Sequence, residues 1–200
     1  MTIRRIAPDV ANKIAAGEVI ERPSSVVKEL IENSIDAGAK RIRVEVDEGG
    51  VSLIRIVDDG HGIQSKELEL AVERHSTSKL ETVADLSRIQ TLGFRGEALA
   101  SIAAVAELTI ASVTNVGTPG RCVITRDGSV VKSTAYGGPL GTQVTVRSLF
   151  HSLPARRQFL KAARTELGHV VDVVTHMAIG HPDVAPGILE KGLLRLLTKK

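Results

Sequence analysis

Two strand-like segments lie so close together in the sequence that they restrict how the chain can pair. Residues 41–46 alternate between polar and apolar side chains, which is typical of a half-exposed strand, and residues 51–57 form a second apolar strand. Only residues 47–50 separate them, and Glu48-Gly49-Gly50 can form a tight turn. Because a parallel pair needs a crossover of a dozen or more residues, the two strands are predicted to be antiparallel.

Helical patterns flank this hairpin. A helix is predicted from Pro23 to about Asp36, with proline at the first helical position and Gly38 just past the end. Other helices are predicted at 65–74, at 97–106, from Pro154, and along a segment whose apolar side contains Leu167, Val170, Val171, Val174, Met177 and Ala178. Further strands are predicted at 108–113, 121–125, 130–133 and 142–149, with Asp127-Gly128 as a hairpin turn. This order predicts an α+β fold with helices covering one face of a mostly antiparallel sheet.

The composition is that of a folded globular chain, with 42% hydrophobic and 24% charged residues. Cys122 is the single cysteine, which excludes an internal disulfide and a cysteine-rich zinc site. The longest apolar stretch, residues 98–106, is too short to span a bilayer, and the N-terminus lacks a continuous apolar signal segment. We expect a cytosolic protein without a membrane partner. The net charge of +3 permits an anionic partner without indicating one.

A carboxylate and an amide lie one turn apart on the first long predicted helix. Glu29 and Asn33 are neighbours on its surface, beside Val26 at the border of the apolar half. Taken alone, this pair of residues favours an ordinary solvated face of the helix. The alternative is that both project into a cleft, where the amide oxygen ligates Mg²⁺ and the carboxylate activates a water molecule.

The segment Asp58-Asp59-Gly60-His61-Gly62 follows a predicted strand and allows three interpretations. A calcium loop would need acidic or amide residues at Gly60 and Gly62, so it is excluded. A dinucleotide fingerprint is excluded because it needs a parallel βαβ unit. In the third, the two glycines let the backbone pass close to a flat ring while Asp58 accepts a hydrogen bond from an exocyclic amine. A plain turn remains open.

A second glycine-containing loop opens into a helix at Gly93-Phe94-Arg95-Gly96. Exposed N–H groups and the positive end of the helix dipole favour phosphate there, and Arg95 could add charge-assisted hydrogen bonds. The sequence contains no Walker A pattern, which excludes a P-loop enzyme.

Taken together, these segments resemble the GHKL ATPase superfamily and, within it, the MutL family of DNA mismatch repair proteins. The similar strings are residues 14–19, 23–39, 58–63, His75 with 77–79, 93–99, 141–142 and 154–157. The resemblance covers roughly residues 1–184. It implies a Bergerat-type two-layer α/β sandwich with a mostly antiparallel mixed sheet.

The resemblance also implies roles for individual residues. Glu29 would be the general base, and Asn33 would ligate Mg²⁺ that bridges the phosphates of ATP. Asp58 would bind the adenine amine, with Thr142 nearby through water, and Gly60 and Gly62 would shape the pocket. The remaining implied nucleotide contacts are Ile63, Thr77, Ser78, Lys79, Leu92, Gly93, Phe94, Arg95 and Gly96, of which Lys79, Arg95, Gly93 and Gly96 would hold the phosphates as a lid.

Some features depart from the family pattern. His151-Ser152 stands where the family more often has Tyr-Asn or Asn-Asn, and Pro186-Gly187 is expected to interrupt a strand that usually follows Val184. Residues 185–200 are expected to form a truncated or divergent tail. Family members carry a second domain and a C-terminal dimerisation domain, so this chain is expected to be a fragment or a truncated member.

The leading hypothesis is an ATP-driven switch in mismatch repair with slow Mg²⁺-dependent hydrolysis. The resemblance implies a homodimer on nucleotide binding, weak non-specific contact with DNA, the mismatch-recognition protein MutS as a partner, and a bacterial, nucleoid-associated cytoplasmic location. A topoisomerase-type GHKL domain is one alternative. The other is a non-enzymatic DNA-binding domain, supported by Arg156, Arg157, Lys161 and Arg164, although a solvated helix face explains those residues equally well.

Overall fold

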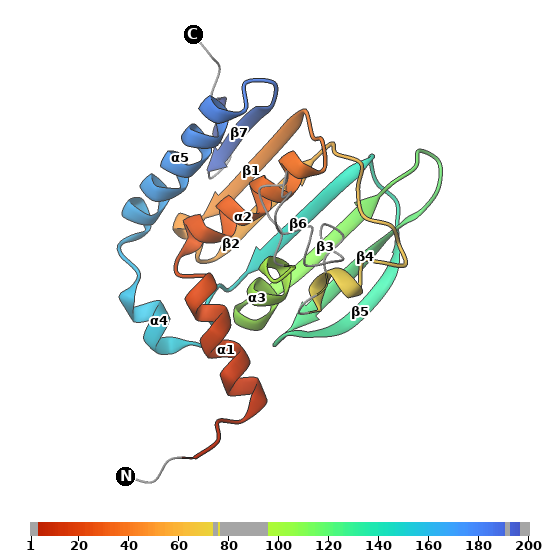
Figure 1. Cartoon of the computed structure of the whole chain (residues 1–200). Coiled ribbons are helices and arrows are strands. Elements are labelled where there is room, and N and C mark those ends of the chain that lie inside the picture. The colour runs from red at the N-terminus through yellow and green to blue at the C-terminus, as the bar shows by residue number, and fades with distance from the viewer. Residues whose placement is uncertain (1–3, 74–75, 77–95, 191–192, 197–200) are drawn as a thin grey trace, which may run out of the picture.

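The chain folds into a sheet with helices over one face (Figure 1). The computed structural model describes residues 4–73, 76, 96–190 and 193–196. Across these residues the sheet has eight strands in the order β5-β4-β3-β6-β2-β1-β7-β8. The strands are β1 (Arg41–Asp47), β2 (Leu53–Asp58), β3 (Glu107–Val113), β4 (Gly120–Arg126), β5 (Ser129–Tyr136), β6 (Gly141–Arg147), β7 (Ala185–Glu190) and β8 (Leu193–Leu196). The α-helices are α1 (Pro8–Val19), α2 (Pro23–Asp36), α3 (Ala98–Val105), α4 (Pro154–Phe159) and α5 (Ala163–Gly180).

The predicted hairpin is present. β1 and β2 are antiparallel, with Ile42 opposite Asp58 and Asp47 opposite Leu53. β2 continues to β6, and β6 to β3, also antiparallel, whereas β1 and β7 run parallel. The prediction of a two-layer α+β fold with a mostly antiparallel mixed sheet is therefore confirmed.

The core lies between the helices and the sheet. Along β1, Ile42, Val44 and Val46 are buried while Arg41 and Arg43 are exposed, so one face of the strand meets the helices. α2 contributes Val26, Val27, Leu30 and Ile31 to the same apolar cluster. Because each such side chain contributes about 1.5–3 kcal/mol when fully buried, this interface fixes α2 above the sheet.

The ends of α2 match the sequence signals. Pro23 occupies the first turn, where its missing N–H costs no helical hydrogen bond. Gly38 follows the last turn with φ of 72°, and its N–H donates to the Ile35 carbonyl at 2.9 Å. The helix consequently ends at Asp36, and four residues connect it to the start of β1 at Arg41.

The helix predicted at 65–74 was wrong. Residues 65–69 form turns and Leu70–Val72 a short 3₁₀ helix, while Arg74 lies outside the described residues. Leu68 and Val72 are buried, but Leu70 is half exposed, so the segment offers only a narrow apolar face. Short helices need such a face to be stable, which explains why turns prevail.

The interruption predicted at Pro186-Gly187 was also wrong, because both residues belong to β7. Pairing of β7 with β8 begins at Gly187, so Pro186 lies where the missing N–H removes no bond to β8. The division of the chain at Val184 stays a prediction.

Candidate functional site

The buried carboxylate of Asp58 lies at the end of β2. The strand alternates, so Asp58 lies on the same face as Ile54 and Ile56 and points toward the helices. Its neighbour on one side is Ile42 of β1, and on the other side Thr142 of β6. The alternation that buries Ile54 and Ile56 thus also places the Asp58 side chain between the sheet and the helices.

Three protein donors hold the Asp58 carboxylate. Oδ1 accepts hydrogen bonds from the Gly60 N–H at 3.0 Å and the Thr142 N–H at 3.2 Å, and Oδ2 accepts one from the Ser34 hydroxyl at 2.9 Å. Burial raises the pKa of Asp58 above its ordinary value, although these hydrogen bonds oppose the rise and the charge of Asp59 adds to it. The carboxylate is oriented, poorly solvated and able to accept a further hydrogen bond.

The glycines after Asp58 allow the loop to pack against the protein's own backbone. Gly62 has φ of 74°, and a Cβ there would lie 2.5 Å from the carbonyl oxygen of Val113. A Cβ at Gly60 would lie 2.8 Å from the Ala37 carbonyl oxygen, at the end of α2. The loop is therefore pinned between α2 and β3. The expected close approach to a bound ring stays a prediction.

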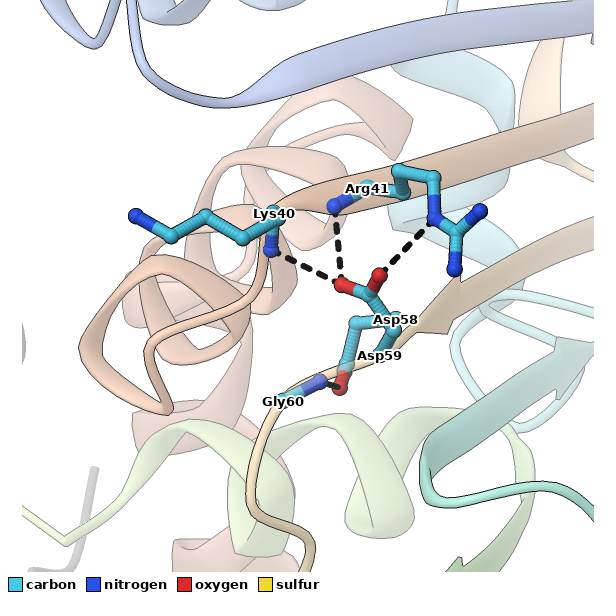
Figure 2. Close-up of polar contacts among 5 residues, drawn as sticks. All are labelled: Lys40, Arg41, Asp58, Asp59 and Gly60. Atoms are coloured by element: carbon cyan, nitrogen blue, oxygen red, sulfur yellow. Dashed lines mark hydrogen bonds and ion pairs between the residues drawn. The ribbon is translucent and has the colours of Figure 1, made fainter.

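The adjacent carboxylate, Asp59, has a different task. Figure 2 shows it directed to the start of β1, where Oδ1 accepts from the backbone N–H groups of Lys40 and Arg41, each at 2.8 Å, and Oδ2 contacts Arg41 Nε at 2.9 Å. Desolvation raises the pKa of Asp59, but the hydrogen bonds from Arg41 and Lys40 outweigh it and hold that pKa below its ordinary value. Asp59 therefore fastens the edge of the loop to β1.

Glu29 and Asn33 lie one turn apart on α2, and both are half-buried. Ser34, the residue after Asn33, donates to Asp58, and the His61 N–H donates to the Ala37 carbonyl at 3.0 Å. The helix that carries the predicted base and ligand is thus joined to the Asp58 loop at two points. The roles of Glu29 and Asn33 stay predictions.

Thr142 and Ile63 are brought together by a buried hydroxyl. Ser112 Oγ accepts a hydrogen bond from the Ile63 N–H at 2.8 Å and lies 3.0 Å from Thr142 Oγ1. Because the Thr142 N–H also donates to Asp58, the network joins three of the predicted nucleotide contacts. Thr142 and Ser112 are opposite each other on β6 and β3.

The predicted phosphate loop is described only at its end. Gly96 has φ of 62° and precedes Glu97, whose carbonyl accepts the first α3 hydrogen bond, from Ser101 at 2.8 Å. This agrees with a glycine opening into a helix. Seven other predicted nucleotide contacts lie outside the described residues, and they are Thr77, Ser78, Lys79, Leu92, Gly93, Phe94 and Arg95.

A hollow of about 830 Å³ adjoins the loop that follows Asp58. It is lined by residues 61–67 and by the connection after β3, which includes Thr114, Asn115, Thr118 and Pro119. Gly62 and Ile63 belong to its wall, whereas Asp58 does not. The polar groups around Asp58, which form the candidate site, therefore lie beside this hollow and not at its centre.

Sequence reasoning missed Ser34 and Ser112. Ser34 lies on the buried side of α2 and Ser112 on the buried side of β3, and both hydroxyls are hydrogen-bonded. The sequence does contain a signal for both residues, because a serine at a core-facing position requires a hydrogen-bond partner. The partner of Ser34 depends on how α2 packs against β2, and the partners of Ser112 depend on the pairing of β3 with β6, which the sequence does not specify.

Within the described part of the chain, His, Cys, Asp and Glu side chains form no group of three that could hold a metal ion. Across the same residues, every helix is too short or too polar to cross a bilayer.

Comparison with known proteins agrees with this geometry. The family described as histidine kinase-, DNA gyrase B- and HSP90-like ATPase matches residues 20–134. The DNA mismatch repair protein MutL of Koribacter versatilis (strain Ellin345) is 53% identical over 182 residues, covering 91% of this chain and 28% of the relative. The MutL of Pseudomonas fluorescens (strain SBW25) is 53% identical over 190 residues, covering 92% and 29%. The chain spans a little more than a quarter of the length of these relatives.

Solved structures are similar over most of the chain. The Aquifex aeolicus MutL ATPase domain complexed with ADP has a TM-score of 0.75 and 33% identity, covering 91% of this chain and 65% of that one. The N-terminal domain of a DNA repair protein has a TM-score of 0.78 and 29% identity, covering 95% and 56%. This chain therefore belongs to the histidine kinase-, DNA gyrase B- and HSP90-like (GHKL) ATPases and, within them, to the N-terminal ATPase domains of the MutL family.

Proposed function

We propose that this domain binds ATP and hydrolyses it slowly in the presence of Mg²⁺, and that nucleotide binding drives a conformational switch in DNA mismatch repair. The observation that carries the proposal is the Asp58 carboxylate, buried and held by donors from α2, its own loop and β6. A fixed acceptor at the end of a strand is suited to the exocyclic amine of adenine. The solved relative named as an ADP complex supports a nucleotide as the ligand.

Glu29 and Asn33 fit the chemistry of phosphate hydrolysis. The two residues lie one turn apart on α2, the helix whose Ser34 contacts Asp58. Mg²⁺ usually takes one or two protein ligands and completes its shell with water and phosphate oxygens, so a cluster of three protein ligands is not required. Asn33 would hold the ion, which when bound would neutralise charge on the phosphates. Glu29 would orient a water molecule and accept its proton.

A nucleotide titration tests the proposal. The wild-type chain is titrated with adenylyl imidodiphosphate and Mg²⁺ while binding and molecular mass are followed together, and ATP turnover is measured separately. Glu29→Ala should bind the analogue with wild-type affinity and lose hydrolysis, because the base is not needed for binding. Hydrolysis retained in Glu29→Ala would remove Glu29 from its role. A folded wild-type chain that fails to bind the analogue would overturn the proposed function.

The remaining expectations concern the whole protein. We propose that nucleotide binding promotes a homodimer, that MutS is a partner, and that the protein works in the bacterial cytoplasm close to the nucleoid. The support is the similarity to relatives named as mismatch repair proteins. A rise in mass on analogue binding would support dimerisation, and an unchanged monomer mass at saturation would contradict it for this chain.

A basic surface at α4 makes DNA contact the second candidate. Arg157, Lys161 and Arg164 are exposed, whereas the Arg156 guanidinium packs beside Gly17 of α1. The three exposed cations are suited to phosphate. DNA retention that weakens with salt but ignores ATP would favour a DNA-binding module over a nucleotide switch, and retention that changes with ATP would favour the switch.

A further inference from the structure

Three polar residues lie side by side across neighbouring strands. Asp58 of β2 is opposite Thr142 of β6, and Thr142 is opposite Ser112 of β3. All three face the helical layer and are buried, with Ser112 only 1% exposed. Directly opposed residues lie about 5 Å apart, so hydrogen bonds can pass along the row from one strand to the next. Asp58 and Thr142 already belong to the proposed adenine site, and Ser112 stands behind them.

One arrangement of hydroxyl hydrogens satisfies all three polar contacts of Ser112. The Ile63 N–H donates to its oxygen at 2.8 Å, and its own hydroxyl donates to the Gly141 carbonyl at 3.1 Å. A hydroxyl has one hydrogen and two lone pairs. The hydrogen and one lone pair are used by these two partners, so the third contact, at 3.0 Å to Thr142 Oγ1, is satisfied when Thr142 donates to Ser112.

The polarity of Thr142 follows from this count. Its hydroxyl hydrogen points inward to Ser112, which leaves its oxygen to act only as an acceptor toward anything beyond the row. Asp58 is also an acceptor, and its carboxylate already receives hydrogen bonds from Ser34, Gly60 and Thr142. The two groups therefore present lone pairs alone. A ligand amine is attracted to such a surface, and a ligand carbonyl is repelled.

We propose that Ser112 is a specificity-determining positioning residue, which orients the Thr142 hydroxyl so that the site accepts a purine with a 6-amino group and rejects one with a 6-oxo group. The inference rests on the proposed ATP binding and deepens it. Ser112 acts through Thr142 and does not itself contact the base. Without Ser112, the Thr142 hydroxyl loses its inward acceptor and is able to turn its proton toward a 6-oxo group.

The test compares two bases that differ at this position. Imidodiphosphate analogues of ATP and of inosine triphosphate are titrated with Mg²⁺ into the wild-type chain and into Ser112→Ala. The wild type should prefer the adenine analogue by more than tenfold. Ser112→Ala should lose about fivefold of that preference, the factor that corresponds to one ordinary hydrogen bond. Thr125→Val is the matched control, because it removes a buried hydroxyl that donates to the Leu108 carbonyl and leaves the row intact.

A double-mutant cycle separates positioning from general destabilisation. Thr142→Val alone should lower the preference for the adenine analogue about fivefold. Adding Ser112→Ala should change that preference less than twofold further, since the hydroxyl through which Ser112 acts is already removed. If Ser112→Ala folds poorly, Thr142→Val still tests whether the Thr142 hydroxyl sets the base preference. An unchanged preference in either single variant, or full additivity, would overturn the role of Ser112 while ATP binding stands. Failure of the wild type to bind either analogue would overturn the proposed function itself.

Discussion

Asp58 and Asp59 are adjacent in sequence and oppositely placed in the fold. Asp58 is buried against α2 and β6, and burial raises its pKa. Asp59 is directed to the start of β1, and its hydrogen bonds with Arg41 and Lys40 hold its pKa low (Figure 2). The alternation of the strand explains the difference, because consecutive residues leave it on opposite faces. The Asp58 carboxylate is thereby buried in the layer of the helices, and the Asp59 carboxylate fastens the loop to β1.

The comparison teaches that hydrogen-bond count does not distinguish the two carboxylates. Each aspartate accepts from two backbone N–H groups and one side chain. They differ in solvation and in the charge of the side-chain donor, which is a neutral hydroxyl for Asp58 and a guanidinium for Asp59. A buried acceptor without a cation nearby retains its capacity for a ligand donor, whereas Arg41 has already satisfied Asp59.

The largest expected effect is on nucleotide binding. Asp58→Asn should weaken binding of the ATP analogue about 100-fold, because an amide donor would face the adenine amine and a charge-assisted hydrogen bond would be lost. Asp59→Asn, the same change one residue later, should alter binding less than threefold. Isothermal titration of both variants measures this, with circular dichroism to verify folding. Equal losses of analogue affinity in the two variants would contradict the distinction between Asp58 and Asp59.

Ser34→Ala should have an intermediate effect. It removes the hydroxyl that donates to Asp58 and lies 3.0 Å from the Leu30 carbonyl, and we expect a loss of about 1 kcal/mol in unfolding free energy. The pKa of Asp58 should rise further, since one of the bonds opposing the rise is lost. Urea unfolding and an Asp58 titration followed by NMR provide the measurements. Ser25→Ala on the same helix controls for the higher helix propensity of alanine, and matching results for both serines would contradict the role of Ser34.

Arg41→Ala should have a smaller effect. Its guanidinium is 82% exposed, so we expect a loss of about 0.5 kcal/mol or less, and the backbone N–H groups of Lys40 and Arg41 still hold Asp59. The Asp59 pKa should move up toward its ordinary value. Arg43→Ala, on the same face of β1, is the control for removing a positive charge. A loss of analogue affinity specific to Arg41→Ala would show that the Asp59 side of the loop also serves the ligand.

The fold was predictable from the sequence where periodicity and turn residues act locally. The β1–β2 hairpin, the limits of α2 and the Asp127-Gly128 turn follow from alternation, Pro23 and glycine positions. The segment at 65–73 was not, because Leu68 and Val72 have the four-residue spacing of one helix face, while the stability of a helix there depends on how much of its apolar surface the core can cover. Tertiary contacts decided that region.

The sequence predicted residues that the structure brings together around Asp58, but it did not predict the hydrogen bonds that join them, and the roles of these residues in binding stay predictions. Asp58 and Thr142 were expected from the resemblance, yet the residues that orient them, Ser34 and Ser112, were missed. The role of Ser112 arises from the registers of β2 with β6 and of β6 with β3, which join positions 29 to 84 residues apart in sequence. The role of Ser34 arises from the packing of α2 against the end of β2. Sequence patterns report which face a residue occupies, and only the register reports its neighbour.

The smallest differences should appear in acid, as opposite slopes of stability against pH. For Asp58 the folded pKa lies above its unfolded value of 3.8, so the folded state binds more protons between the two values, and stability falls as pH rises through that window. For Asp59 the folded pKa lies below 3.8, so its contribution is complete above 3.8 and is lost as pH falls through the folded pKa. At neutral pH both contributions are flat.

Urea unfolding of the wild type, Asp58→Asn and Asp59→Asn between pH 3 and pH 7 separates these terms. Relative to Asp58→Asn, the wild type should lose stability as pH rises through the Asp58 window. Relative to Asp59→Asn, it should gain stability with rising pH until 3.8 is passed. Each variant is the control for the other, because both remove one carboxyl from the same loop. Difference curves with the same sign would mean that the two carboxyls share one environment, and the separation of a ligand-facing from a fold-facing aspartate would no longer hold.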